Sequence, residues 1–231
     1  MTELQGSVDL LAPALQICLI DLLLAGDNAL VIAMASRGLP ARLWRRAVWL
    51  GTGAAVVLRI ALTVLAALIL NVPFLKLIGA VLLLAIAVKL LAEEAPASAE
   101  HDGARPGRGV LSAFTTILVA DTVMSLDNVL AVAAAARGSF WLLAFGLALS
   151  VPIVIFGSVA VARLLDRFPL LILGGGALLG WVAGDTAVSD PAIRGWVSRQ
   201  AFDLSMVAPA IGAVYVLIHG RLLRQNRASH R

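Results

Sequence analysis

Long apolar runs alternate with short polar segments along the whole chain. Each run is long enough to cross a bilayer as a helix, which takes about 20 residues, and none shows the strict alternation of a half-buried strand. A spanning backbone must satisfy its own hydrogen bonds, so the runs predict helices. Seven of them are expected, at roughly 10–36, 43–70, 73–92, 110–136, 139–163, 168–185 and 203–224.

Composition agrees with this pattern. Hydrophobic residues make up 61% of the 231 residues and charged residues 14%, and the mean hydropathy is +0.96. A soluble domain is far more polar. The sequence therefore predicts an all-α fold, a polytopic helical membrane protein.

The polar residues of the first run return in the fourth. "DLLLAGDNAL" at 21–30 and "DTVMSLDNVL" at 121–130 are related by an offset of 100 residues, and Arg-Gly follows both at the same distance. The matched polar pairs are Asp21 with Asp121, Asp27 with Asp127, and Asn28 with Asn128. Each unit contains three runs, an odd number, so the second copy enters the membrane in the opposite sense. We predict a 3+3 inverted repeat with a seventh helix appended.

A polar segment, "AEEAPASAEHDGARPGRG", separates the two copies. It is rich in Ala, Pro, Gly and charge, which is typical of a solvated linker. The predicted organisation is a first three-helix repeat at 1–92, a cytoplasmic linker at 93–109, a second, inverted repeat at 110–185, and an outer loop, seventh helix and basic cytoplasmic tail at 186–231.

Arginine and lysine lie mostly on one predicted side of the membrane. That side holds the loops after the first, third and fifth runs and the C-terminal tail, whereas the opposite side has Arg137, Arg194 and Arg199. The positive-inside rule then predicts a multi-pass protein of a bacterial inner membrane with its N-terminus outside and its C-terminus in the cytoplasm. The sequence pI of about 10.2 is explained by this topology, and no nucleic-acid partner is expected.

The duplicated carboxylates are the candidate chemistry. A charged group at the bilayer centre costs about 2.5 to 3.5 kcal/mol on translocon scales, so four aspartates near one depth need a partner. Oxygen ligands suit hard divalent cations such as Mn²⁺, Mg²⁺ or Ca²⁺. His101, His219 and His230 lie in the linker or at the C-terminal end, which disfavours zinc or copper at the midplane. We expect a metal ion as transported substrate and no permanently bound cofactor.

The predicted metal ligands belong to both copies: Asp21, Asp27, Asn28, Asp121, Asp127 and Asn128. One straight helix cannot wrap its three groups round one ion, because they point in different directions along about 10 Å of helix. Either the first helix breaks near Gly26, or the first and fourth helices share the site. Ser125 and Thr122 could add oxygen ligands.

Other polar positions leave alternatives open. Arg59, in the second run, either pairs with an aspartate or extends its long side chain to the membrane surface. Asp185 either binds or gates ions at the outer mouth or is an ordinary interfacial residue, and Asp190 is expected to be solvated.

Three functions compete on these residues. The first is divalent cation transport at a midplane acidic site. The second is export of small organic cations or amino acids, which the aromatic content of 6% disfavours. The third is a membrane assembly or scaffold protein, in which the polar residues only join helices by hydrogen bonds. No pattern of a nucleophile with its base is present, so an enzyme is not expected.

The paired "DxxxxxDN" motifs, "MASRGLP" after the first and "LLGWVAGDTAVSDP" near the sixth run together resemble the TerC family of integral membrane proteins, in particular its short YjbE-like branch. The resemblance covers nearly the whole chain. It implies seven helices and, from several members, manganese export, while other members are linked to tellurite resistance or to thylakoid membrane assembly. It also implies ion binding by the six residues of the two motifs. Asp185 departs from the glutamate expected after "WVAG", which shortens its reach.

Overall fold

The computed structural model describes residues 13–23, 26–37, 39–69, 72–92, 106–136, 138–168, 170–200 and 202–229. Within these ranges the chain forms helices and turns and no strand, so the predicted all-α class is confirmed. The helices are Pro13–Leu23, α2 (Gly26–Ala35), α3 (Ala41–Val64), α4 (Ala66–Ile69), α5 (Leu75–Ala92), α6 (Pro106–Ala136), α7 (Phe140–Arg167), α8 (Leu170–Val188), α9 (Pro191–Gln200) and α10 (Phe202–Ser229).

The described helices account for six or seven membrane spans. Six single helices are long and apolar enough to cross a bilayer, and the pair Pro13–Leu23 and Asp27–Ala35, bent by 59°, makes a seventh if it is one span. These helices coincide with the seven predicted runs, which confirms a polytopic membrane protein. The bend lies where the sequence suggested a break near Gly26, whereas α6 runs without interruption through the second motif.

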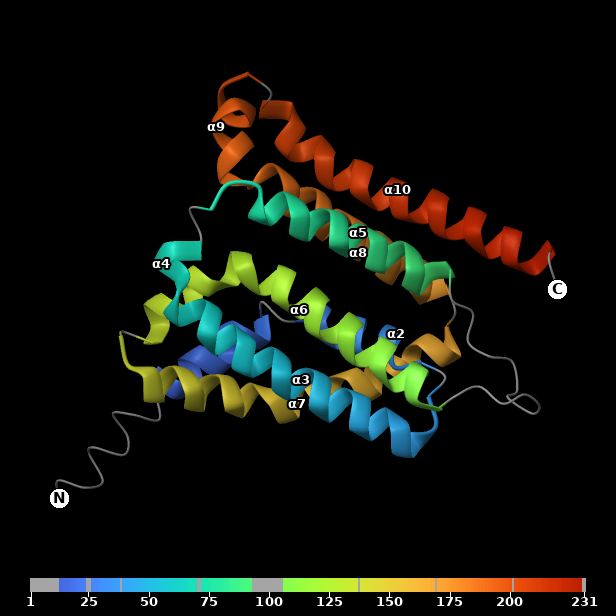
Figure 1. Cartoon of the computed structure of the whole chain (residues 1–231), viewed down its shortest axis with the longest axis horizontal. Coiled ribbons are helices and arrows are strands. Elements are labelled where there is room, and N and C mark those ends of the chain that lie inside the picture. The colour runs from blue at the N-terminus through green and yellow to red at the C-terminus, as the bar shows by residue number, and fades with distance from the viewer. Residues whose placement is uncertain are drawn as a thin grey trace.

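The helices alternate in direction and form two layers (Figure 1). In that view α5, α7 and α10 end on the side where α3, α6 and α8 begin. One layer contains α2, α3, α6 and α7, and the other contains α5, α8 and α10. The first helix of each copy packs on the second helix of the other, α2 on α7 and α6 on α3, while α5 packs on α8. A twofold relation between the copies would give this reciprocal packing of first and second helices. The domain boundaries themselves stay a prediction.

Local sequence explains where α7 begins. Gly138 turns the chain after α6 with a φ of 78°, a left-handed conformation that costs glycine no steric strain. Ser139 then caps α7, since its hydroxyl oxygen accepts the backbone N–H of Leu142 at 3.3 Å. An N-cap serine satisfies one of the unpaired donors of the first turn.

One helix, α9, lies in the predicted outer loop. Its 10 residues are too few to span a bilayer. Asp190 caps it by accepting the backbone N–H of Ala192 at 2.7 Å, and Pro191 occupies the first helical position, where its missing N–H costs nothing. These are recognisable start signals, so the sequence contained the information for α9.

Glycines allow α8 and α10 to touch through their backbones. A Cβ at Gly184 would overlap the carbonyl of Ala208, and one at Gly180 would overlap the backbone of Gly212. Small residues at helix crossings are the usual means of close approach in membranes, where packing rather than the hydrophobic effect joins helices. This contact holds α10 against the layer of α5 and α8.

We predict that Gly184→Ala destabilises the protein by about 1 to 3 kcal/mol, the usual cost of overpacking. Gly174→Ala is the matched control, because a Cβ at Gly174 in the same helix meets nothing within 4 Å. Thermal unfolding of the detergent-purified protein, followed by size-exclusion chromatography, measures both. Equal midpoints for the two variants would mean that the α8–α10 contact is not required.

Candidate ion-binding site

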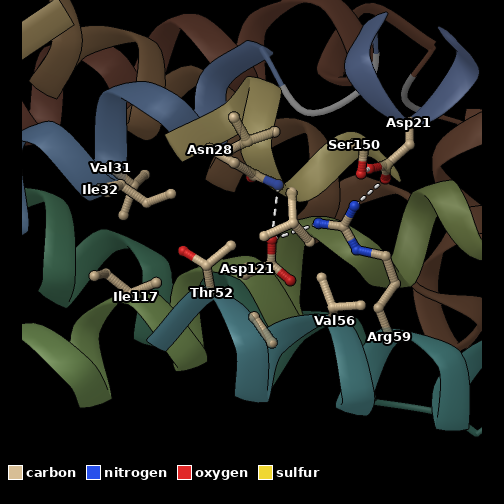
Figure 2. Close-up of a pocket in the computed structure, with 13 residues that line it drawn as sticks. Asp21, Asn28, Val31, Ile32, Thr52, Val56, Arg59, Ile117, Asp121 and Ser150 are labelled. Atoms are coloured by element: carbon tan, nitrogen blue, oxygen red, sulfur yellow. Dashed lines mark hydrogen bonds and ion pairs between the residues drawn. The ribbon is translucent and has the colours of Figure 1, made fainter. Parts of the chain in front are cut away.

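A small buried cavity lies within the layer that contains both acidic motifs. Its volume is about 20 Å³, enough for one water-sized particle. Helix Pro13–Leu23 contributes Asp21, α2 contributes Asn28, α3 contributes Thr52 and Arg59, and α6 contributes Asp121. Figure 2 shows these polar groups converging on one another. Ser150 of α7 and apolar side chains, among them Val31, Ile32, Val56, Ile117 and Val154, complete the wall.

Arg59 is the charged hub of this site. Its guanidinium lies between Asp21 and Asp121 and donates a hydrogen bond to each carboxylate (Figure 2). The side chain of Arg59 is 5% exposed, that of Asp21 4% and that of Asp121 12%. Of the two alternatives for Arg59, the structure has the ion pair.

Further donors complete the hydrogen bonding of the two carboxylates. Asn28 donates from Nδ2 to Asp121 Oδ1 at 2.7 Å, and Ser125 donates to Asp121 Oδ2 at 3.3 Å. Ser150 donates its hydroxyl to Asp21 Oδ2. Arg59 also reaches Ser125, with its Nε donating to the hydroxyl oxygen at 2.8 Å. The network joins all the helices around the cavity.

Two buried oxygen atoms beside this network lack a partner. They are Oδ1 of Asn28 and Oγ1 of Thr52, for which the described residues supply no hydrogen bond. Both side chains line the cavity and both residues are nearly fully buried, with 5% and 6% exposed. A buried polar atom without a partner costs about 1 to 3 kcal/mol. Amide and hydroxyl oxygens are also atom types that coordinate hard cations.

The other predicted ligands lie outside the cavity wall. Asp127 forms an ion pair with Lys76 of α5 and accepts the hydroxyl of Thr186 at 3.2 Å. Asp27 lies in the first turn of α2 and has one buried oxygen, Oδ1, without a partner among the described residues. Asn128 is half-buried in α6. Within the described ranges, no three acidic, histidine or cysteine residues are close enough to hold a metal ion by themselves.

Comparison with known proteins places the chain in a family. The model for the "Integral membrane protein TerC family" matches residues 7–228. The chain belongs to the TerC family. The "Uncharacterized membrane protein YjbE" of Bacillus subtilis (strain 168) is 40% identical to this TerC chain over 210 residues, which cover 91% of this chain and 94% of the relative. No solved structure shows a significant match.

The TerC motifs thus meet only in part. Asp21, Asn28 and Asp121 share the cavity, and Ser125, a predicted additional ligand, is bound to both Arg59 and Asp121. Thr122 instead donates its hydroxyl to Leu118 of its own helix at 2.6 Å. Sequence reasoning missed three polar neighbours from other runs: Thr52, Ser150 and Lys76. Single hydroxyls in apolar helices are too common to have identified the first two.

The end of the bundle near α9 is organised by Asp190 rather than by Asp185. Asp190 is fully buried, so the prediction that it is solvated was wrong. Its carboxylate accepts the backbone N–H groups of Phe74 at 3.0 Å and Leu77 at 3.1 Å, which ties the start of α5 to α9. Phe74 needs this support because its φ of 66° is unusual for a bulky residue. Asp185 is exposed.

Backbone donors set the charge state of Asp190. Burial alone would raise the pKa of this carboxyl, but the N–H groups of Ala192, Phe74 and Leu77 favour the anion and lower the pKa below its ordinary value of 3.8. A lowered pKa means that the carboxylate stabilises the folded state above pH 3.8 and that this contribution is lost as the pH falls through the folded-state pKa.

We therefore expect Asp190→Asn to lower the stability at pH 7 by about 1 to 3 kcal/mol, since one oxygen acceptor is replaced by a donor that faces N–H groups. Asp185 is an exposed carboxylate in the same region. Asp185→Asn therefore serves as the control and should unfold like the wild type. The difference should shrink as the pH is lowered below 3.8. Thermal unfolding across a pH series measures it, and a pH-independent difference would contradict this account of Asp190.

Proposed function

We propose that this TerC protein transports a divalent metal cation, with Mn²⁺ as the substrate and efflux as the direction. The observation that carries the proposal is the cavity beside Asp121, whose wall includes Asn28 and Thr52, each with a buried side-chain oxygen that has no partner among the described residues. Its carboxylate, amide and hydroxyl oxygens are the donor set that hard cations prefer. Among those cations, Mn²⁺ is favoured by the TerC resemblance.

The charge of the site supports a cation as cargo. Two carboxylates, those of Asp21 and Asp121, flank one guanidinium in an apolar layer, so acidic groups outnumber basic ones in this network. Intramembrane ionisable residues of this kind commonly mark ion pathways. A purely structural network would be expected to satisfy its buried oxygens, whereas here Asn28 and Thr52 of the cavity wall each keep one oxygen without a partner among the described residues.

The remaining motif residues are assigned to the path of the ion. Asp127 and Asn128 follow Asp121 by six and seven positions in the unbroken helix α6, or about 9 to 10 Å along its axis. Asp27 stands one residue before Asn28. We propose that these groups, with Thr186 beside Asp127, receive the cation on its way to or from the cavity by alternating access.

The proposed setting is a bacterial inner membrane, with the N-terminus outside and the arginine-rich loops and C-terminus in the cytoplasm. That orientation follows from the positive-inside rule. In it the protein acts as a transporter and not as an enzyme, and its partners are the metal ion and the lipid bilayer.

We expect Asp121→Asn to abolish manganese efflux, because it removes a carboxylate from the wall of the cavity that Asn28 and Thr52 also line. The measurement is intracellular manganese, by elemental analysis, in a manganese-sensitive, efflux-deficient bacterium that expresses wild type or variant. Asp166→Asn is the matched control, as it changes an exposed carboxylate by the same substitution. Wild type and Asp166→Asn should lower cell manganese, and Asp121→Asn should not.

Membrane abundance of each variant must be equal for this comparison. If wild type leaves manganese, magnesium and calcium at the level of the empty vector, the transport proposal is wrong. The membrane-assembly alternative would then be the better explanation of the buried polar network.

A further inference from the structure

We propose that Arg59 is a tethered counter-cation that occupies the acidic site when no metal is bound and must leave Asp121 before the transported cation can bind there. This inference rests on the proposed function and concerns the same site. It assigns to Arg59 a role in regulating metal affinity, in addition to the pairing of buried carboxylates that the ion pairs show.

Every carboxylate oxygen of Asp21 and Asp121 already accepts a hydrogen bond. Asp121 Oδ1 accepts hydrogen bonds from Arg59 and Asn28, and Asp121 Oδ2 accepts one from Ser125. Asp21 Oδ1 accepts one from Arg59, and Asp21 Oδ2 accepts one from Ser150. Asp121 Oδ1, the oxygen beside Asn28, accepts two hydrogen bonds, which use both of its lone pairs. A metal ion therefore cannot bind this oxygen without displacing a hydrogen-bond donor.

The three donors to Asp121 differ in how they can be displaced by a metal ion. Asn28 can turn its amide about the last side-chain bond and present Oδ1 instead of Nδ2, and the hydroxyl of Ser125 can rotate. Neither carries a charge. Arg59 carries a positive charge that cannot be removed by deprotonation, and like charges repel strongly where water is excluded. Arg59 is thus the donor whose departure decides whether a divalent cation binds.

The two carboxylates, Asp121 and Asp21, differ in their neighbours. Asp121 adjoins Asn28, whose Oδ1 is unpartnered and which lines the cavity with Thr52. Asp21 is held instead by Ser150 of α7. The structure therefore offers oxygen ligands to a metal at Asp121 and a second anion for the guanidinium at Asp21. We infer that Arg59 withdraws toward Asp21 while Asp121 takes the metal.

This exchange has a consequence for transport. An empty site that retained both carboxylates without a cation would be costly within a bilayer. With Arg59 in place, the negative charge of the empty site is offset by the guanidinium. The return of Arg59 to Asp121 then helps the metal to leave. A competitor built into the chain lowers the affinity for metal and, by the same amount, favours release.

The test is equilibrium binding of Mn²⁺ to the purified full-length chain, with free Mn²⁺ measured by electron paramagnetic resonance. Arg59→Gln should lower the dissociation constant for Mn²⁺ by about fivefold or more, the lower end of typical coupling between competing interactions. Arg37→Gln is the matched control. It removes an arginine from an ion pair with the exposed Asp166, at 3.2 Å, and should leave the affinity unchanged.

A second pair of variants protects the test against misfolding. Asp21→Asn confines Arg59 to Asp121 and should weaken Mn²⁺ binding. The double variant, Asp21→Asn with Arg59→Gln, lacks one negative and one positive charge, so its net charge equals that of the wild type. It should restore tight Mn²⁺ binding. If Arg59→Gln does not fold, the comparison of Asp21→Asn with the double variant decides alone.

The outcomes separate this inference from the proposed function. If wild type binds Mn²⁺ and Asp121→Asn does not, but loss of Arg59 leaves the affinity unchanged or weaker in both backgrounds, the cation site stands and the counter-cation role is wrong. If neither wild type nor any variant binds Mn²⁺, Mg²⁺ or Ca²⁺, the proposed function fails and the inference fails with it.

Discussion

A charge inside a lipid bilayer must have a partner, and the pairing of Arg59 with Asp21 and Asp121 is the constraint on which this structure depends. The three residues come from helix Pro13–Leu23, α3 and α6. Their ion pairs therefore fix one helix of each copy against α3. Removing one partner would leave an uncompensated buried charge, which commonly destabilises the folded state by about 3 to 5 kcal/mol.

The two layers follow from where the polar groups lie. The layer of α2, α3, α6 and α7 surrounds the charged network and the cavity, and its helices are joined by side chains. The layer of α5, α8 and α10 is joined mainly by close packing, including the backbone contact at Gly180 and Gly184. Lys76 and Asp127 link the two layers by an ion pair. Charge thus organises one layer and small residues organise the other.

The sequence predicted the fold well because length and apolarity determine a membrane span. It also identified the duplicated motif, because aspartates in apolar runs are conspicuous. It could not show which aspartates meet: that depends on helix rotation and on partners such as Lys76 and Thr52, which lie in other runs and carry no motif. Asp190 was misjudged because the backbone N–H groups of Phe74 and Leu77 that bind it come from a distant segment of the chain. Its position as the N-cap before Pro191 was recognisable but does not imply burial.

The most direct test of the central claim is Mn²⁺ flux into liposomes that contain the purified protein and a metal-sensitive dye inside. A purified system removes every other transporter and every assembly partner. The account predicts that Mn²⁺ enters protein-containing liposomes faster than empty ones and that Asp121→Asn removes the difference. Equal rates in protein-containing and empty liposomes, with protein inserted and folded, would contradict it.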